Sequence, residues 1–163
     1  MNTRLLLLIA SLVTSPLARV TNAQSARTHP DLNGVWVMDT LKSIRPDGLN
    51  TLAITIAASG DTLIMDAVAV TAIGPITSHQ VFGVDGRPWK NSILTGQGSL
   101  DTRSVLLWKK SRLLITTTSD VQGTAFVQRD EWVVSPSRKS VKITRTIDMG
   151  GQQQTSSLVL IRR

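Results

Sequence analysis

Apolar and polar side chains alternate with a period near two along most of the chain beyond residue 30, in short runs rich in β-branched residues. Gly, Pro, Asp, Asn or Ser interrupts these runs about every ten residues. A period of two puts every second side chain on one face of a strand, so the pattern predicts half-buried β-strands. We predict ten strands: Val35–Asp39, Leu52–Ala58, Thr62–Val70, Ile76–Phe82, Lys90–Leu94, Ser104–Trp108, Leu113–Thr118, Thr124–Val134, Val141–Asp148 and Ser157–Ile161.

The fold class expected from these strands is all-β, a single antiparallel up-and-down β-barrel of about eight to ten strands. Short connections make neighbouring strands antiparallel. Closing the sheet removes long unpaired edges, which would otherwise template aggregation. A two-sheet sandwich is the alternative, although the long strand Thr124–Val134 fits a tilted barrel better.

The N-terminus has the three-part layout of a secretory signal peptide over residues 1–23. Arg4 precedes the apolar run Leu5–Val13, and the small residues Thr21-Asn22-Ala23 follow where a signal peptidase would cut. The apolar run is shorter than the roughly 20 residues that a membrane helix needs, so no transmembrane segment is expected after cleavage. The other interpretation is an apolar first element of the mature fold. We therefore expect an exported protein, periplasmic or secreted, with a flexible tail at residues 24–30 and one domain at 31–163.

Two segments carry a family resemblance. Asp31–Asp39, with its Gly-x-Trp, and the following Lys42-Ser43 resemble the first motif of the lipocalins and the start of a group of uncharacterised exported bacterial lipocalin-like proteins. Asp130–Pro136 resembles the Asp-x-Trp-x-x-Ser-Pro of the same group. The second lipocalin motif, Thr-Asp-Tyr, is absent, because the chain contains no Tyr. The resemblance implies a cup with one closed and one open end.

Lipocalins usually carry an Arg near the last strand that packs on the Trp of the first motif. The resemblance therefore implies that Gly34, Trp36 and Arg162 close the barrel, with a cation–π contact worth on the order of 1 kcal/mol. Arg163 is an alternative partner for Trp36.

Alternating turns divide the charges between the two ends of the expected barrel. One end is basic; its predicted turns hold Arg87, Lys109, Lys110, Arg112, Arg138 and Lys139. This end could contact an anionic envelope surface, or its charges could serve only solubility. The other end is near neutral and has the two longest expected connections, Leu41–Asn50 and Thr95–Arg103, so we expect the mouth there.

The expected interior is apolar, with Arg145 as the exception. Trp108 and Trp132 are in phase with apolar neighbours and are expected to be core residues or walls of a ligand cavity. Arg145 shares the face of Val141, Ile143 and Ile147, where a cation needs a partner. That partner is either Asp130 in the preceding strand or the carboxylate of a fatty-acid-like ligand.

The sequence contains no pattern that predicts an enzyme, a metal site or a cofactor. There is no Cys, and of the two histidines His29 belongs to the tail and His79 to a strand. Asp130 and Glu131 are adjacent and would face opposite sides of a strand. Nucleic acid is not an expected partner, because the basic strands lack interleaved aromatic residues. The leading hypothesis is a lipocalin-like protein that binds a small apolar or amphipathic molecule. The alternative is a non-enzymatic interaction module that contacts an envelope component through its basic end.

Overall fold

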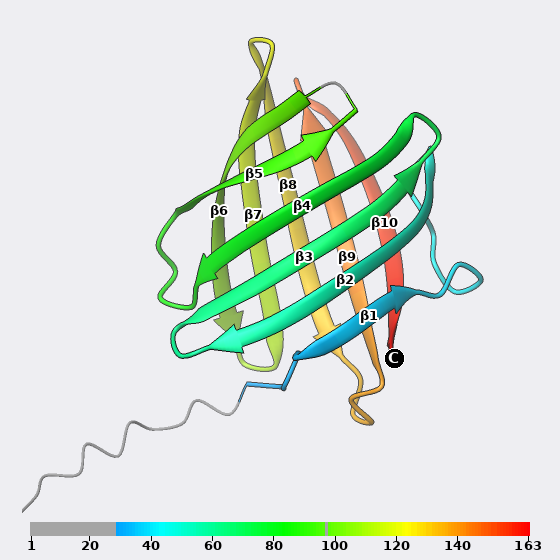
Figure 1. The fold of residues 1–163 in the computed structure, drawn as a ribbon, viewed down its shortest axis with the longest axis vertical. Helices are drawn as coiled ribbons and strands as arrows, with labels where there is room; N and C mark the ends of the chain where they lie inside the picture. Colours follow the sequence, from blue (N-terminus) through cyan, green and yellow to red (C-terminus); the bar gives the residue numbers. More distant parts are fainter. Residues whose placement is uncertain (1–28, 97) are drawn as a thin grey trace, which may run out of the picture.

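A computed structural model describes residues 29–96 and 98–163 and shows a closed ten-stranded barrel (Figure 1). The predicted signal peptide and residues 24–28 of the predicted tail lie outside the described residues. The strands are β1 (Gly34–Met38), β2 (Leu49–Ser59), β3 (Thr62–Thr71), β4 (Gly74–Gly83), β5 (Trp89–Thr95), β6 (Gly98–Lys109), β7 (Arg112–Val121), β8 (Thr124–Val134), β9 (Ser140–Met149) and β10 (Gln152–Arg162).

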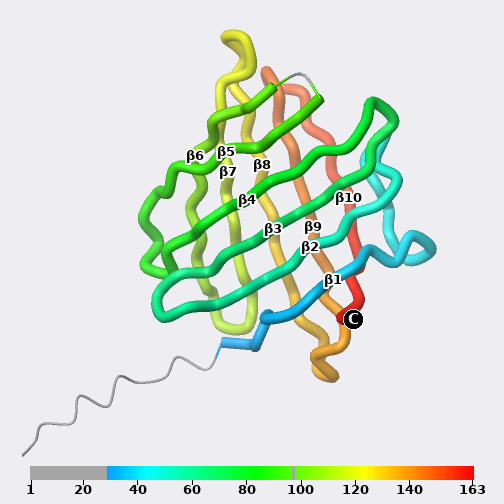
Figure 2. The backbone as a smooth tube through the Cα atoms, in the orientation of Figure 1, coloured from blue at the N-terminus to red at the C-terminus, as the bar shows by residue number. Residues whose placement is uncertain are grey.

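Each strand pairs antiparallel with its neighbours in sequence, and β1 pairs with both β2 and β10. The tube in Figure 2 can be followed up and down around the barrel until the red last strand reaches the blue first one. The predicted all-β, up-and-down barrel is thereby confirmed, and the sandwich alternative is wrong. No helix occurs in the part of the chain that the structure describes.

The prediction of a long connection at Thr95–Arg103 is wrong, because most of this segment belongs to β6. β5 and β6 form a hairpin in which Trp89 pairs with Ser104 at one end and Thr95 pairs with Gly98 at the other. β6 therefore begins at Gly98. Gly98 has φ of 123°, a conformation that glycine adopts without a Cβ penalty. Beyond it Leu100 and Thr102 alternate inward, as in any other strand of the barrel. The Gly-rich composition hid this alternation in the sequence.

The turns alternate between two ends of the barrel, and we name the ends accordingly. The mouth end is formed by residues 39–48 and by the β3–β4, β5–β6, β7–β8 and β9–β10 turns. The closed end is formed by the other four turns and by both chain termini of the barrel (Figure 1). Large side chains fill the closed half, among them Trp36, Leu63, Phe82, Leu106 and Leu160, all of them buried.

The barrel closes through the first motif. Trp36 on β1 lies opposite Arg162 on β10, and the guanidinium carbon lies 4.7 Å from the indole centroid. The Trp36 indole N–H donates to the carbonyl of Leu32 at 2.7 Å, and Arg162 donates to the carbonyl of Asp31 at 2.6 Å. These contacts confirm the predicted Trp36–Arg162 pair. They also hold Leu32, which precedes β1, inside the core.

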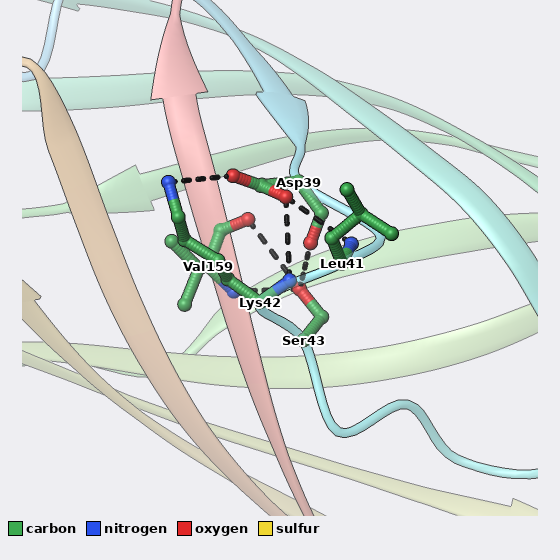
Figure 3. A network of polar contacts seen from close by, with 5 residues as sticks. All are labelled: Asp39, Leu41, Lys42, Ser43 and Val159. Atoms are coloured by element: carbon green, nitrogen blue, oxygen red, sulfur yellow. Dashed lines mark hydrogen bonds and ion pairs between the residues drawn. The ribbon is translucent and has the colours of Figure 1, made fainter.

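Because β1 has five residues and β10 has eleven, the closure needs a second device (Figure 3). The Asp39 amide donates to the carbonyl of Val159 at 2.8 Å, and the Ser43 hydroxyl accepts from the Val159 amide at 2.9 Å. The Asp39 carboxylate accepts from the amides of Leu41 and Lys42 and pairs with the Lys42 ammonium at 3.0 Å. Asp39 and the Lys42-Ser43 pair therefore tie residues 39–43 to the edge of β10 beyond β1.

Candidate functional site

The interior contains a cavity of about 620 Å³ that reaches the mouth end. Its upper wall comes from residues 46–49 and from the β3–β4 turn, and its floor includes Ile54, Met65, Phe82 and Trp132. Two small side chains, Ala67 and Ala69 on β3, widen it on one side, because a larger residue at either position would occupy this space. The lining is mostly apolar, as in ligand sites of other barrels. The mouth thus lies at the predicted end, although only one of the two long connections expected there, residues 39–48, is present.

Among the polar side chains of the lining, Gln128, Asp130 and Arg145 form one connected group, which we call the polar cluster. Asp130 on β8 and Arg145 on β9 are directly opposite in the register, so both side chains point inward from neighbouring strands. The Arg145 Nε donates to Asp130 Oδ1 at 2.8 Å, and Nη2 donates to Oδ2 at 2.7 Å. The Gln128 amide adds a third hydrogen bond to Oδ2 at 3.1 Å. The predicted internal ion pair is confirmed.

The electrostatics of this pair keep Arg145 charged. Burial by itself lowers the pKa of the Arg145 guanidinium, but the charge and hydrogen bonds of Asp130 outweigh that effect and raise the pKa above its ordinary value. Asp130 is almost completely buried, whereas 19% of the Arg145 side chain remains accessible. Both residues line the cavity. The cluster is therefore a neutral pair of ions whose more accessible member is the cation.

Trp132 lies beside the cluster and carries a polar atom without a partner. Its side chain is buried, it lines the cavity, and its indole N–H has no hydrogen-bond acceptor among the described residues. A buried N–H without an acceptor costs about 1–3 kcal/mol, and because less than 1 Å² of this nitrogen is accessible, a ligand in the cavity does not reach it in this arrangement. Of the four tryptophans, Trp132 is the one that lines the cavity.

Trp108, also predicted as a candidate ligand residue, is not among the residues that line the cavity. It lies near the closed end of β6, packed against the core, and its ring stacks on the imidazole of His29 with centroids 4.5 Å apart. His29, which the sequence predicts to belong to the flexible tail, is thus held against the barrel. The structure brings together Arg145 and Trp132 and leaves Trp108 apart.

The six residues predicted at the basic end all lie in or beside turns of the closed end. Arg87 pairs with Asp85, and Arg112 pairs with Glu131 at 2.7 Å. The other four, Lys109, Lys110, Arg138 and Lys139, form no ion pair within the described residues. Glu131 faces outward while Asp130 faces inward, as predicted for neighbours on a strand.

Two polar features were not predicted. His79 lies opposite Asp66 of β3, with 2.6 Å between its Nδ1 and Asp66 Oδ1, although sequence spacing suggested no carboxylate partner. A polar hollow of about 460 Å³ lies on β5, β6 and β7, where the β6–β7 pairing ends at Arg103–Thr118. The Thr102 hydroxyl there is buried and has no hydrogen-bond partner among the described residues. Within residues 29–96 and 98–163, no group of three or more potential metal ligands occurs.

The comparisons with known proteins assign no family. No protein-family model matches the chain, and no curated protein matches its sequence. The resemblance to lipocalins therefore remains a prediction, whereas the barrel itself is a structural fact. In the described part of the chain, no helix has the length and apolar character needed to cross a membrane.

Proposed function

We propose that this chain is an exported lipocalin-like protein, periplasmic or secreted, that binds one small apolar or amphipathic molecule inside the barrel and is not an enzyme. The observation that carries the proposal is the cavity of about 620 Å³. This volume falls within the roughly 300–1,000 Å³ typical of small-molecule sites, and it is far larger than a space for a few waters. A filled core would have argued against a ligand.

The surface around the mouth supports the same proposal. Two exposed large apolar side chains lie where the cavity lining reaches the mouth: Ile73 on the β3–β4 turn is 81% exposed, and Met149 at the end of β9 is 43% exposed. Exposed apolar residues gathered around a cavity are typical of a binding site, whereas single scattered ones are ordinary. They would give an apolar molecule a path into the barrel.

The test compares the wild type with two matched variants, each of which replaces one alanine with phenylalanine. Native mass spectrometry and solvent extraction of protein purified from its own host should recover about one small apolar or amphipathic molecule per chain. Ala69→Phe places a ring in the cavity and should abolish recovery, whereas Ala57→Phe on the exposed outer face of β2 should not. Binding that is equal in both variants, or absent from the wild type, would refute the proposal.

A second function, contact of the closed end with an anionic envelope surface, is favoured by one observation. Lys109, Lys110, Arg138 and Lys139 lie at the same end and have no ion-pair partner in the described chain. Such contact would weaken with rising salt. An empty barrel that cosediments with anionic vesicles at low salt, and a K109E/K110E variant that does not, would support this function in place of ligand binding.

A further inference from the structure

We propose that the cavity selects ligands whose polar end is an uncharged oxygen group, such as an alcohol, aldehyde, ketone or ester, over ligands that end in a carboxylate. This inference rests on the proposed function and names the chemical class of its ligand. It is carried by the charge balance of the cavity wall and by the N–H groups that remain without acceptors there.

The first step is the charge balance. Arg145 is the only cation among the residues that line the cavity, and Asp130 already neutralises it through two hydrogen bonds of 2.7–2.8 Å. Asp47 at the mouth is the other charged residue of the lining. A bound carboxylate would therefore meet no uncompensated positive charge, and it would share one guanidinium with Asp130. Two carboxylates so close together repel each other strongly where water is excluded.

The second step is the supply of donors. A guanidinium has five N–H groups, and Arg145 uses two of them for Asp130. The other three have no acceptor within the described residues, and Arg145 is the more accessible member of the ion pair. Asp130 has both carboxylate oxygens occupied and is shielded. The wall of the cavity thus offers donors next to a neutral pair of ions, which suits a neutral acceptor.

The experiment measures the affinities of the full chain for three probes of equal length, 1-dodecanol, dodecanoate and dodecane, by competition with a fluorescent probe at pH 8. Dodecanol should bind about tenfold or more tightly than dodecanoate, and more tightly than dodecane. Dodecanoate that binds as tightly as the alcohol would overturn the inference while leaving the proposed function intact. If none of the three binds, the proposed function fails and the inference fails with it.

Two variants test the two steps separately. D130N removes the compensating charge and should reverse the order, so that dodecanoate binds about tenfold or more tightly than dodecanol. An unchanged order in folded D130N would overturn the inference. D130L/R145M removes the guanidinium donors together with both charges and should weaken dodecanol binding several-fold with little effect on dodecane. An equal loss for dodecanol and dodecane in this variant would exclude the guanidinium as the donor. Because the double variant leaves no lone buried charge, it remains informative if D130N does not fold.

Discussion

Replacing Arg145 with Met should strongly destabilise the barrel, because the substitution leaves the buried Asp130 carboxylate without its ion-pair partner. Asp130 is almost completely buried, and after the loss of Arg145 it would keep one hydrogen bond, from Gln128. Removal of one partner of a buried ion pair costs about 3–5 kcal/mol. For a domain of this size such a loss lowers the melting temperature by roughly 10 °C or more. Urea unfolding monitored by circular dichroism at neutral pH measures the loss in the free energy of unfolding.

The double variant D130L/R145M separates the burial of a lone charge from the loss of the pair itself. Replacing both ions with apolar residues of similar size is often neutral or stabilising by about 1–4 kcal/mol, so the double variant should recover most of the stability that Arg145→Met loses. The reasoning is refuted if Arg145→Met costs less than about 1 kcal/mol, or if the double variant is less stable than the single one.

Three further predictions concern closure and packing. Trp36→Ala should cost about 3–5 kcal/mol in urea unfolding, because it opens a cavity at the fully buried seam and removes the Arg162 contact; a cost below about 1 kcal/mol would contradict this role. Gly83→Ala should cost about 1–3 kcal/mol by thermal melting, because the new methyl would collide with the Trp89 indole, and an unchanged melt would exclude the clash. The hydrogen bond from Lys42 lowers the pKa of Asp39 in the folded protein. The contribution of Asp39 to the free energy of unfolding is therefore fully present above its unfolded pKa and is lost as pH falls through the folded pKa. Asp39→Asn should therefore flatten the acid side of a stability–pH profile below about pH 4, and an unchanged slope would show that the pair is inert.

Alternation in the sequence was sufficient to predict the number and order of the strands, although it missed the first halves of β6 and β10. It placed ten strands, and it put Arg145 on the inner face. These successes share a cause: a period of two together with short turns determines the inward face and the strand order without knowledge of side-chain packing.

The depth of each side chain along the barrel axis could not be predicted in this way. Trp108 and Trp132 have the same inward phase, yet Trp132 lines the cavity and Trp108 stacks on His29 outside it. Depth depends on strand tilt and shear, which a periodic pattern does not specify. The sequence could not decide the partner of Arg145 for a similar reason. Asp130 or a ligand could neutralise the charge, and the choice depends on the β8–β9 register.

Quenching of tryptophan fluorescence by a brominated aliphatic alcohol tests most directly whether the barrel takes a ligand into its interior. Since Trp132 alone among the tryptophans lines the cavity, 11-bromo-1-undecanol should quench the wild type saturably at about one molecule per chain. The same titration should produce almost no quenching in W132F and unchanged quenching in W108F. Absence of saturable quenching in the wild type, or equal quenching in W132F, would contradict ligand binding inside the barrel.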